Sequence, residues 1–279
     1  MNEIESAISR MLNKDLKKTV EIVELTNRCP VHGEYTVKKF IYNDGTSIEI
    51  PNGCPTCEEE RVNAYKERVE KQVREKTYEE YKASNISPEY FDKTLADFVP
   101  ETKAQKAALQ AIETIVSSRK GKLVILGTNG VGKTMLGSIA VKLLGGKIYT
   151  MYEISVRIRQ SYSANSKETE LDILNELVNE PLLVIDEVGR VKMSEAIQDW
   201  FSYILDKRGS QNKPYILLGN LHLKNDCEQG GCPDCFENYF DKDVLSRLTQ
   251  NSVIIIIDAK DYRRNEHSCT FISDKRKEA

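Results

Sequence analysis

The sequence predicts an α/β protein in which a parallel sheet flanked by helices follows a small zinc-binding domain. Short apolar runs at residues 123–126, 182–185 and 253–257 alternate with segments of helical periodicity. Strands that are buried on both faces of a parallel sheet have such continuous apolar runs, and helices then cover the two faces. Cysteine and histidine pairs at residues 29–32 and 54–57 predict the metal-binding domain.

The alternation of strands and helices begins near residue 101 and continues to the last apolar run. The expected strands are 123–126, 146–150, 181–187, 215–218 and 253–257, and the expected helices are 101–117, 135–143, 152–162, 168–178, 193–208 and 242–249. In a parallel sheet the polar groups that act on a ligand gather at the carboxyl ends of the strands. We therefore expect the functional site at that edge.

The segments before the sheet are more polar. Residues 5–18 have the spacing of a short amphipathic helix, and residues 58–83 predict an exposed, charged helix that ends at the break at 85–88. The expected domains are a zinc-binding domain at 1–66, a helical linker at 67–85 and the α/β domain at 86–279.

Composition describes a soluble globular protein, with 40% hydrophobic and 30% charged residues among 279. The chain has no apolar run long enough to cross a membrane, and its first residues lack the layout of a signal peptide, so we expect a cytoplasmic protein. A net charge of −3 argues against a broadly polycationic nucleic-acid binder, but it leaves room for a local basic groove.

Residues 127–134, with the sequence GTNGVGKT, match the phosphate-binding P-loop pattern G-x-x-x-x-G-K-[ST]. They stand between an apolar strand and a helix with one apolar face, as this motif requires. Glycines let backbone N–H groups approach phosphate oxygens, the lysine reaches the β- and γ-phosphates, and the threonine holds Mg²⁺. The alternative is an ordinary glycine-rich turn, which the flanks disfavour. The expected nucleotide ligands are Gly127, Thr128, Asn129, Gly130, Val131, Gly132, Lys133 and Thr134.

Four further residues suit Mg²⁺-dependent ATP hydrolysis. Asp186 and Glu187 close an apolar strand, so the first acid is expected to hold Mg²⁺ and the second to deprotonate the attacking water. Asn220 ends the next strand and can donate to the γ-phosphate or to that water. Arg247, on a predicted helix, is a candidate arginine finger for a neighbouring subunit's nucleotide, and a surface arginine is the alternative.

Six of the seven cysteines fall in two clusters, and in a cytoplasmic protein metal binding is considered before disulfides. The first cluster has the pattern C-x2-H and C-x2-C around a β-hairpin, which predicts a closed, structural zinc site; unliganded thiols are the alternative. Its expected ligands are Cys29, His32, Cys54 and Cys57.

The second cluster lies in a polar insertion between Asn220 and Arg247. It predicts a second zinc ion, and the alternative is a polar loop whose cysteines are incidental. Its expected ligands are His222, Cys227, Cys232 and Cys235.

Several of these motifs together resemble the DnaC/DnaI family of AAA+ replicative helicase loaders, with the IstB transposition ATPases as close relatives. The resemblance covers about residues 86–265 and rests on the P-loop, LVIDEVG at 183–189, LDKR at 205–208, GNL at 219–221 and SRL at 246–248. It implies an AAA+ core with a central P-loop strand, Asn220 as sensor 1, Arg247 as the trans-acting finger and Arg263 as sensor 2.

The resemblance also implies partners. It implies an ATP-dependent loader that self-associates, binds a DnaB-like hexameric helicase and places it on single-stranded DNA, with no membrane partner. Loaders of this family carry an extra helix along the DNA path, here residues 152–162, where Arg157 and Arg159 would meet phosphates and Tyr162 would stack on a base. A helix that only packs on the core is the alternative for this segment.

Three other functions stay open at this stage. An IstB-type transposition ATPase would use the same core on duplex DNA, although that group usually opens with helices alone. A P-loop kinase or metabolic ATPase would need a substrate lid that no segment predicts. A non-hydrolytic zinc-dependent adaptor would have no use for Glu187 and Arg247.

Overall fold

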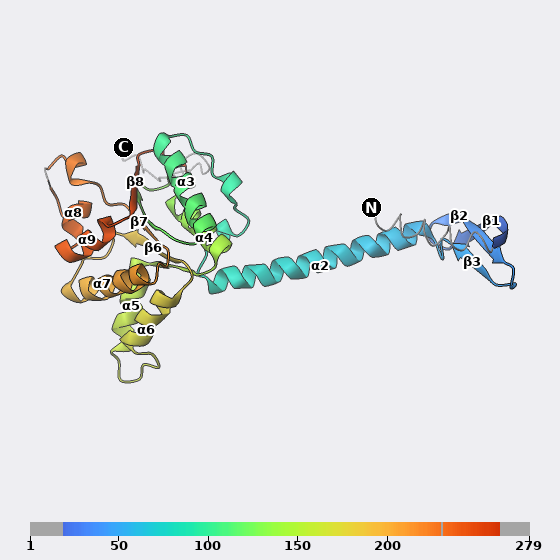
Figure 1. Ribbon diagram of the computed structural model, residues 1–279, viewed down its shortest axis with the longest axis horizontal. Helices are drawn as coiled ribbons and strands as arrows, with labels where there is room; N and C mark the ends of the chain where they lie inside the picture. The colour runs from blue at the N-terminus through green and yellow to red at the C-terminus, as the bar shows by residue number, and fades with distance from the viewer. Residues whose placement is uncertain (1–18, 230, 263–279) are drawn as a thin grey trace, which may run out of the picture. The chain divides into compact units, whose positions relative to one another are not determined.

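The computed structural model describes residues 19–229 and 231–262 (Figure 1). The chain divides into two compact units, Met1–Lys76 and Thr77–Ala279, with a three-stranded sheet in the first and a five-stranded sheet in the second. The expected helix at 5–18 lies outside the described residues. Within the described ranges, no helix is both long and apolar enough to cross a membrane.

The first unit is an antiparallel sheet followed by a long helix. Its strands are β1 (Thr19–Cys29), β2 (Gly33–Tyr42) and β3 (Ser47–Ile50), paired in the order β1-β2-β3. The sequence predicted a hairpin between the two ligand pairs, and the long strand β1 was not predicted. Helix α2 (Pro55–Ala83) begins earlier than the expected helix at 58–83, and it has no buried residue.

The second unit contains a parallel sheet with the strand order β5-β6-β7-β4-β8. The strands are β4 (Lys122–Gly127), β5 (Lys147–Thr150), β6 (Leu183–Val188), β7 (Tyr215–Gly219) and β8 (Val253–Ile257). All five match expected strands, and the parallel sheet is confirmed. The P-loop strand β4 is an interior strand between β7 and β8, whereas the middle strand is β7.

Helices cover both faces of this sheet (Figure 1). On one face lie α3 (Lys103–Ser118) and α4 (Lys133–Leu144), and on the other lie α5 (Met151–Ser161), α6 (Glu170–Asn179), α7 (Glu195–Ser210) and α9 (Lys242–Thr249). Each of these helices was expected. The short helices η1 (Pro88–Tyr90), η2 (Leu95–Asp97), η3 (Lys224–Asp226) and α8 (Phe236–Tyr239) were not.

The strands show why the sequence contains continuous apolar runs. Along β4, Leu123 and Ile125 belong to the core under α3 and α4, whereas Val124 and Leu126 belong to the core on the opposite face. All four are at most 1% exposed. Because successive side chains of a strand point to opposite faces, a strand covered on both sides needs an apolar residue at every position.

A buried arginine on α7 connects the end of α6 with the residue that precedes β7. Arg208, near the end of α7, is fully buried. Its guanidinium donates to the carbonyls of Leu177 at 2.8 Å and Glu180 at 2.9 Å, near the end of α6, and to that of Pro214 at 2.5 Å, just before β7. It therefore satisfies carbonyl groups at a helix C-terminus that would otherwise be buried without donors.

We expect Arg208→Met to lower the free energy of unfolding by at least about 3 kcal/mol, because several buried carbonyls would lose their donor. The measurement is chemical denaturation of the purified chain. Lys207→Met is the matched control on the same helix, where an exposed side chain should change stability by no more than about 0.5 kcal/mol. Equal midpoints for the two variants would contradict this role of Arg208.

Candidate functional site

The carboxyl ends of β4, β6 and β7 surround the principal cavity of the second unit. Its volume is about 870 Å³, within the usual range for small-molecule sites. The lining includes Lys133, Thr134, Asp186, Glu187 and Asn220. The parallel sheet thus brings together residues that lie far apart in the sequence, at the edge where the sequence placed the site.

The P-loop runs from the end of β4 into α4, whose N-cap residue is Gly132. Gly132 has a φ of +92°, and a Cβ added to it would lie 2.6 Å from the ring of Phe98. At Gly130, with a φ of +77°, a Cβ would lie 1.6 Å from a carboxylate oxygen of Asp261. Both positions need glycine, and the first turn of α4 directs its unpaired N–H groups into the cavity region.

The P-loop lysine is already inside the loop. Lys133 is 7% exposed, and its Nζ donates to the carbonyl oxygens of Gly127 at 2.8 Å and Thr128 at 2.7 Å. Carbonyl oxygens hold the ammonium group in the concave side of the loop, where phosphate oxygens would offer stronger, charged acceptors. The loop, the lysine and the helix N-terminus fit a nucleotide triphosphate.

The two residues expected to hold Mg²⁺ are in direct contact. The Thr134 hydroxyl donates to an Asp186 carboxylate oxygen at 2.7 Å. The other oxygen of Asp186 accepts from the Glu187 backbone N–H at 2.7 Å. Burial raises the pKa of the Asp186 carboxyl, and the Thr134 hydrogen bond opposes that shift. Hydroxyl and carboxylate oxygens are suitable ligands for Mg²⁺, so this pair could hold the ion.

Glu187 occupies an irregular position in β6. Its φ is +57°, and the pairing of β6 with β7 shifts register between Ile185 and Val188. A non-glycine residue in the left-handed region costs roughly 1–3 kcal/mol and is often found at functional sites. The Glu187 carboxylate forms an ion pair with Arg190 at 2.8 Å, on the lining of the cavity.

Asn220, directly after β7, also lies on the cavity. Its side-chain Nδ2 donates to Oδ1 of Asn129 in the P-loop at 2.8 Å. The amide therefore stands beside the loop that is expected to hold phosphates, at a position where its donor can be redirected to a ligand oxygen.

Arg247 is not among the residues that line this cavity. It lies on α9, where its Nε donates to a carboxylate oxygen of Asp206 on α7 at 2.5 Å. This ion pair raises the pKa of the guanidinium. Arg263, the other expected arginine, lies outside the described residues.

Sequence reasoning missed the segment that precedes α3. Residues of this segment that line the cavity include Glu89, Tyr90, Lys93 and Phe98. The Lys142 ammonium on α4 holds the segment in place by donating to the carbonyl of Phe91 at 2.7 Å and to that of Tyr90 at 3.0 Å. No local pattern marks these residues as ligands, because only the folded chain brings them beside the P-loop.

One of the two arginines expected on the DNA path, Arg157, is engaged with acidic side chains. Arg157 on α5 forms ion pairs with Glu168 at 2.6 Å and Glu176 at 2.5 Å, and the first of these contacts lowers the pKa of Glu168. The pairing with Arg157 also lowers the pKa of Glu176 to about 2. Through its ion pair with Glu176, Arg157 connects α5 to α6 in this structure.

Arg159 and Tyr162 are more accessible. Both side chains are exposed, and Tyr162 is 62% exposed. The Tyr162 hydroxyl donates to Glu170 at 2.8 Å, and Arg159 donates through Nε to the Ser155 carbonyl at 3.1 Å. Arg159 therefore has no carboxylate partner among the ion pairs of the described residues.

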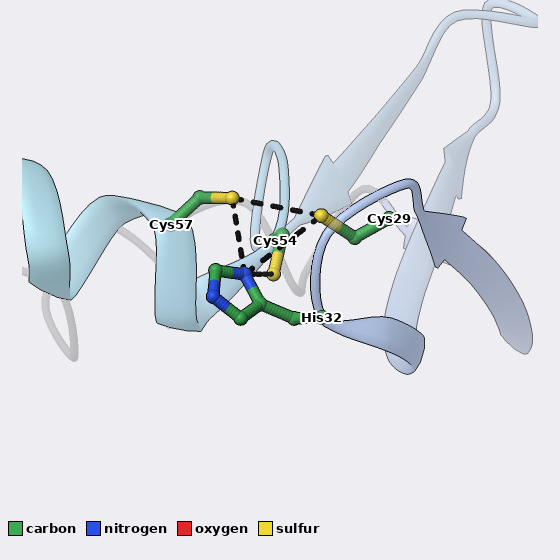
Figure 2. A group of neighbouring side chains, drawn as sticks. All are labelled: Cys29, His32, Cys54 and Cys57. Carbon is green, nitrogen blue, oxygen red and sulfur yellow. Dashed lines mark hydrogen bonds between the residues drawn. The ribbon is translucent and has the colours of Figure 1, made fainter.

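The first cysteine cluster forms a compact group in the first unit (Figure 2). Nδ1 of His32 lies 3.3 Å from the sulfur of Cys57, 3.6 Å from that of Cys54 and 3.9 Å from that of Cys29. Three thiols and one imidazole nitrogen at these separations could hold a tetrahedral zinc ion.

The surroundings of this cluster favour metal ligation. Nε2 of His32 lies 3.1 Å from a carboxylate oxygen of Glu60, the arrangement that orients metal-bound histidines in many proteins. Hydrogen bonding from the backbone at His32 and Val31 lowers the pKa of the Cys29 thiol to about 6. A hydrogen bond with Cys29 raises the pKa of the Cys57 thiol to about 11, so the closely spaced thiols do not ionise equally until an ion holds them.

The second cluster is also assembled. One ligand atom from each of His222, Cys227, Cys232 and Cys235 lies within 4.8 Å of the others. Every one of the eight expected metal ligands therefore lies in one of two four-residue groups.

The parallel five-stranded sheet, the P-loop and the flanking helices match a P-loop NTPase core of the AAA+ class. The family model of the IstB-like ATP binding protein matches residues 58–270, more than half of the chain. The chain therefore belongs to the IstB-like ATP binding protein family.

Similar proteins include replicative helicase loaders. The replicative helicase loader DnaC of Escherichia coli (strain K12) is 28% identical over 152 residues, which are 52% of this chain and 62% of that protein. The replicative helicase loader DnaC of Buchnera aphidicola subsp. Baizongia pistaciae (strain Bp) is 32% identical over 106 residues, 36% of this chain and 43% of that protein. The matches thus span less than two thirds of these relatives.

Solved structures agree on the fold. The crystal structure of the DnaC helicase loader superposes with a TM-score of 0.51 at 21% identity, covering 62% of this chain and all of that one. The replication initiator DnaA bound to AMPPCP and single-stranded DNA gives a TM-score of 0.50 at 18% identity, covering 63% of this chain and 51% of that one. These similarities support the AAA+ fold of the second unit.

Proposed function

We propose that this protein is an ATP-dependent loader that places a replicative DNA helicase on single-stranded DNA during replication. ATP binding and hydrolysis control its assembly and its release from the helicase. The observation that carries this proposal is the similarity of the chain to proteins named replicative helicase loaders, and a cavity lined by Lys133, the Asp186–Glu187 pair and Asn220 supports it.

The chemistry of ATP hydrolysis follows from the residues around the cavity. The P-loop and Lys133 bind the phosphates, and Thr134 with Asp186 would hold a Mg²⁺ ion, which would neutralise phosphate charge. Glu187 turns from Arg190 toward a water molecule and accepts its proton as the water oxygen attacks the γ-phosphorus, while the bond from that phosphorus to the bridging oxygen breaks and ADP leaves. Asn220 exchanges its bond with Asn129 for one to the same water or to the phosphate.

Self-association supplies the last group for hydrolysis, the arginine finger Arg247. Arg247 lies off the cavity of its own chain, and its partner Asp206 is 53% exposed, so the pair sits where a neighbouring subunit can reach it. In the assembly the guanidinium exchanges the Asp206 carboxylate for the γ-phosphate held by the neighbour. An arginine that acts in trans makes hydrolysis depend on assembly.

We expect Arg247→Ala to bind ATP with unchanged affinity and to lose turnover by a factor of about 10³–10⁵, the usual contribution of an arginine finger. Steady-state ATPase rates and nucleotide affinity are the measurements. Lys242→Ala, at an exposed position on the same helix, is the matched control and should keep full turnover.

Two cis variants complete this test. Glu187→Gln should trap ATP and stabilise the assembly, whereas Lys133→Ala should weaken nucleotide binding itself. A wild-type monomer that hydrolyses ATP as fast as the assembled protein would rule out the trans mechanism.

Single-stranded DNA binds along α5 in this proposal. Arg159 meets a phosphate, Tyr162 stacks on a base, and Arg157 reaches a second phosphate by giving up Glu168. The accessibility of Arg159 and Tyr162 supports the path, whereas the Arg157 ion pairs must be exchanged for DNA.

We expect Arg159→Ala to reduce the slope of log affinity against log salt by about 0.7, the value for one phosphate contact on a single strand. Arg157→Ala added to it should reduce the slope by a similar amount again. Fluorescence anisotropy with labelled oligonucleotides at several salt concentrations measures both. Lys120→Ala, an exposed lysine after α3, is the control, and an unchanged slope in the double variant would place the DNA elsewhere.

The zinc-binding segment is the proposed contact to the helicase. We assign residues 1–66 to a partner-binding domain, 67–85 to a helical linker and 86–279 to the ATPase domain. Zinc held by Cys29, His32, Cys54 and Cys57 supplies folding free energy to a unit with little buried apolar surface. Within its described part, Cys29 and Val37 are the hydrophobic residues that are fully buried.

Co-purification with the replicative helicase of the same organism tests the proposed function. We expect the wild-type chain to retain the helicase in the presence of ATP and zinc, and Cys54→Ser with Cys57→Ser to lose it while ATP binding persists. Arg28→Ala, beside the cluster but without a ligand atom, is the control. A wild-type chain that fails to retain the helicase under all conditions would contradict the loader function.

An IstB-type transposition ATPase is the second candidate, because the matching family model is the IstB-like ATP binding protein. Such a protein would bind duplex DNA and would not need a helicase. ATPase stimulation by duplex DNA alone would favour it, and stimulation by single strands together with the helicase would favour the loader.

A further inference from the structure

We propose that the ATPase unit binds a structural zinc ion of its own through His222, Cys227, Cys232 and Cys235. These residues lie in the segment between β7 and α8, apart from the nucleotide cavity, whose lining contains none of them. The proposal does not depend on the loader function, because it concerns the folding of this segment.

The distances within the cluster are those of a zinc site. Nε2 of His222 lies 3.3 Å from the sulfur of Cys232 and 3.4 Å from that of Cys235, and the two sulfurs are 3.9 Å apart. Tetrahedral zinc with ordinary Zn–S and Zn–N bond lengths separates its ligand atoms by roughly 3.5–3.8 Å. Three of the four ligand atoms are therefore spaced as around a zinc ion, and the Cys227 sulfur lies within 4.8 Å of them.

The backbone holds three of the ligands in this arrangement. His222 and Cys235 form a parallel β-bridge, and the N–H of Phe236 donates to the His222 carbonyl at 2.8 Å. The N–H of Cys235 donates to the Cys232 carbonyl at 3.1 Å, closing the turn between the two thiols. A preformed site loses little conformational entropy when an ion binds.

Hydrogen bonds hold the segment, but it has little apolar surface to bury. Residues 224–234 have the sequence KNDCEQGGCPD, with no Ala, Val, Leu, Ile, Met or aromatic residue. An eleven-residue polar excursion cannot bury apolar surface, so the free energy that orders it must come from other contacts. A zinc ion bound by four ligands supplies such free energy in small polar segments.

The same chain contains the same ligand set in its first unit. Three thiols and one histidine form each cluster, and each has a Cys-Pro-x-Cys pair at the start of a helix: Cys57 lies in the first turn of α2, and Cys235 directly precedes α8. The clusters differ at the imidazole: His32 presents Nδ1 to its cysteines, whereas His222 presents Nε2. This difference distinguishes the two sites experimentally.

The zinc ion would act as a positioning element for the ATPase. Beyond Cys235, Tyr239 donates its hydroxyl to the carbonyl of Val191, in the loop that follows Glu187, at 2.5 Å. Phe240 stacks on Phe201 of α7 with ring centroids 5.4 Å apart. The metal would hold the polar segment 224–234 in place. This segment lies between Asn220 and Arg247 and shortly before the packed residues Tyr239 and Phe240.

Metal analysis of the full-length chain, purified without chelators, tests the proposal. We expect two zinc ions per wild-type chain and one after Cys227→Ser, a partly exposed ligand outside the β-bridge. Cys57→Ser is the matched control that removes the other ion, and the two substitutions together should leave none. In Cys227→Ser, amide hydrogen exchange should accelerate over residues 221–235 while ATP affinity stays unchanged.

Histidine NMR on the wild-type chain gives an answer that does not require a folded variant. The protein has three histidines, so the spectrum of ¹⁵N-labelled imidazoles is simple to assign. We expect one imidazole bound to metal through Nδ1, from His32, and one through Nε2, from His222.

One zinc ion per wild-type chain that persists in Cys227→Ser would overturn the proposal. So would a single metal-bound imidazole of the Nδ1 type. A disulfide between Cys232 and Cys235, found by intact mass after alkylation in a chain that binds one zinc, would also overturn it and would indicate a redox-active pair instead.

Discussion

The parallel pairing of β4 with β7 and of β7 with β6 is the constraint on which the nucleotide site depends. In register, the pairing places the P-loop, Asn220 and the Asp186–Glu187 pair at one edge of the sheet. Buried apolar side chains on both faces fix that register, because a shift by one residue would turn each strand's side chains to the other face. The hydrogen bond from Thr134 to Asp186 then links α4 to β6 across the cavity.

Several groups proposed to act on ATP or DNA already have partners in this structure. Glu187 pairs with Arg190, Arg247 with Asp206, and Arg157 with Glu168. Exposed ion pairs such as the first two contribute little to stability, so a charged ligand or a neighbouring subunit can displace them at small cost. In the proposed function these charges stay paired within the chain until ATP, DNA or a neighbouring subunit offers a stronger partner.

The two cysteine clusters lie in segments that share one property, a small buried apolar surface. Each lies in a segment that buries too few apolar side chains to fold firmly on its own: the antiparallel sheet of the first unit and the polar excursion after β7. Both clusters bring four soft or borderline ligands within reach of one ion. In the proposed function the first cluster serves partner binding, and the second steadies the segment that joins two parts of the ATPase.

The sequence by itself determined the features that depend on local order. The P-loop, the acid pair at the end of β6, the C-x2-C pairs and the continuous apolar strands all show in the spacing of neighbouring residues, because the chemistry or the strand geometry acts over a few positions. The start of a helix also depends on neighbouring residues. At the start of α5, for example, the Thr150 hydroxyl accepts a hydrogen bond from the N–H of Glu153, three residues later. The fold class and nine of the nineteen residues that line the cavity could therefore be predicted.

Only the tertiary structure decided which distant segments meet. The strand order, the lining from residues 88–99, the burial of Arg208 against carbonyls of α6, and the acidic partners of Arg157 arise between parts of the chain far apart in sequence. From the sequence alone, an arginine expected to bind DNA cannot be distinguished from one that caps a helix. Their neighbours in space set their charge balance and burial, and packing alone determines those neighbours.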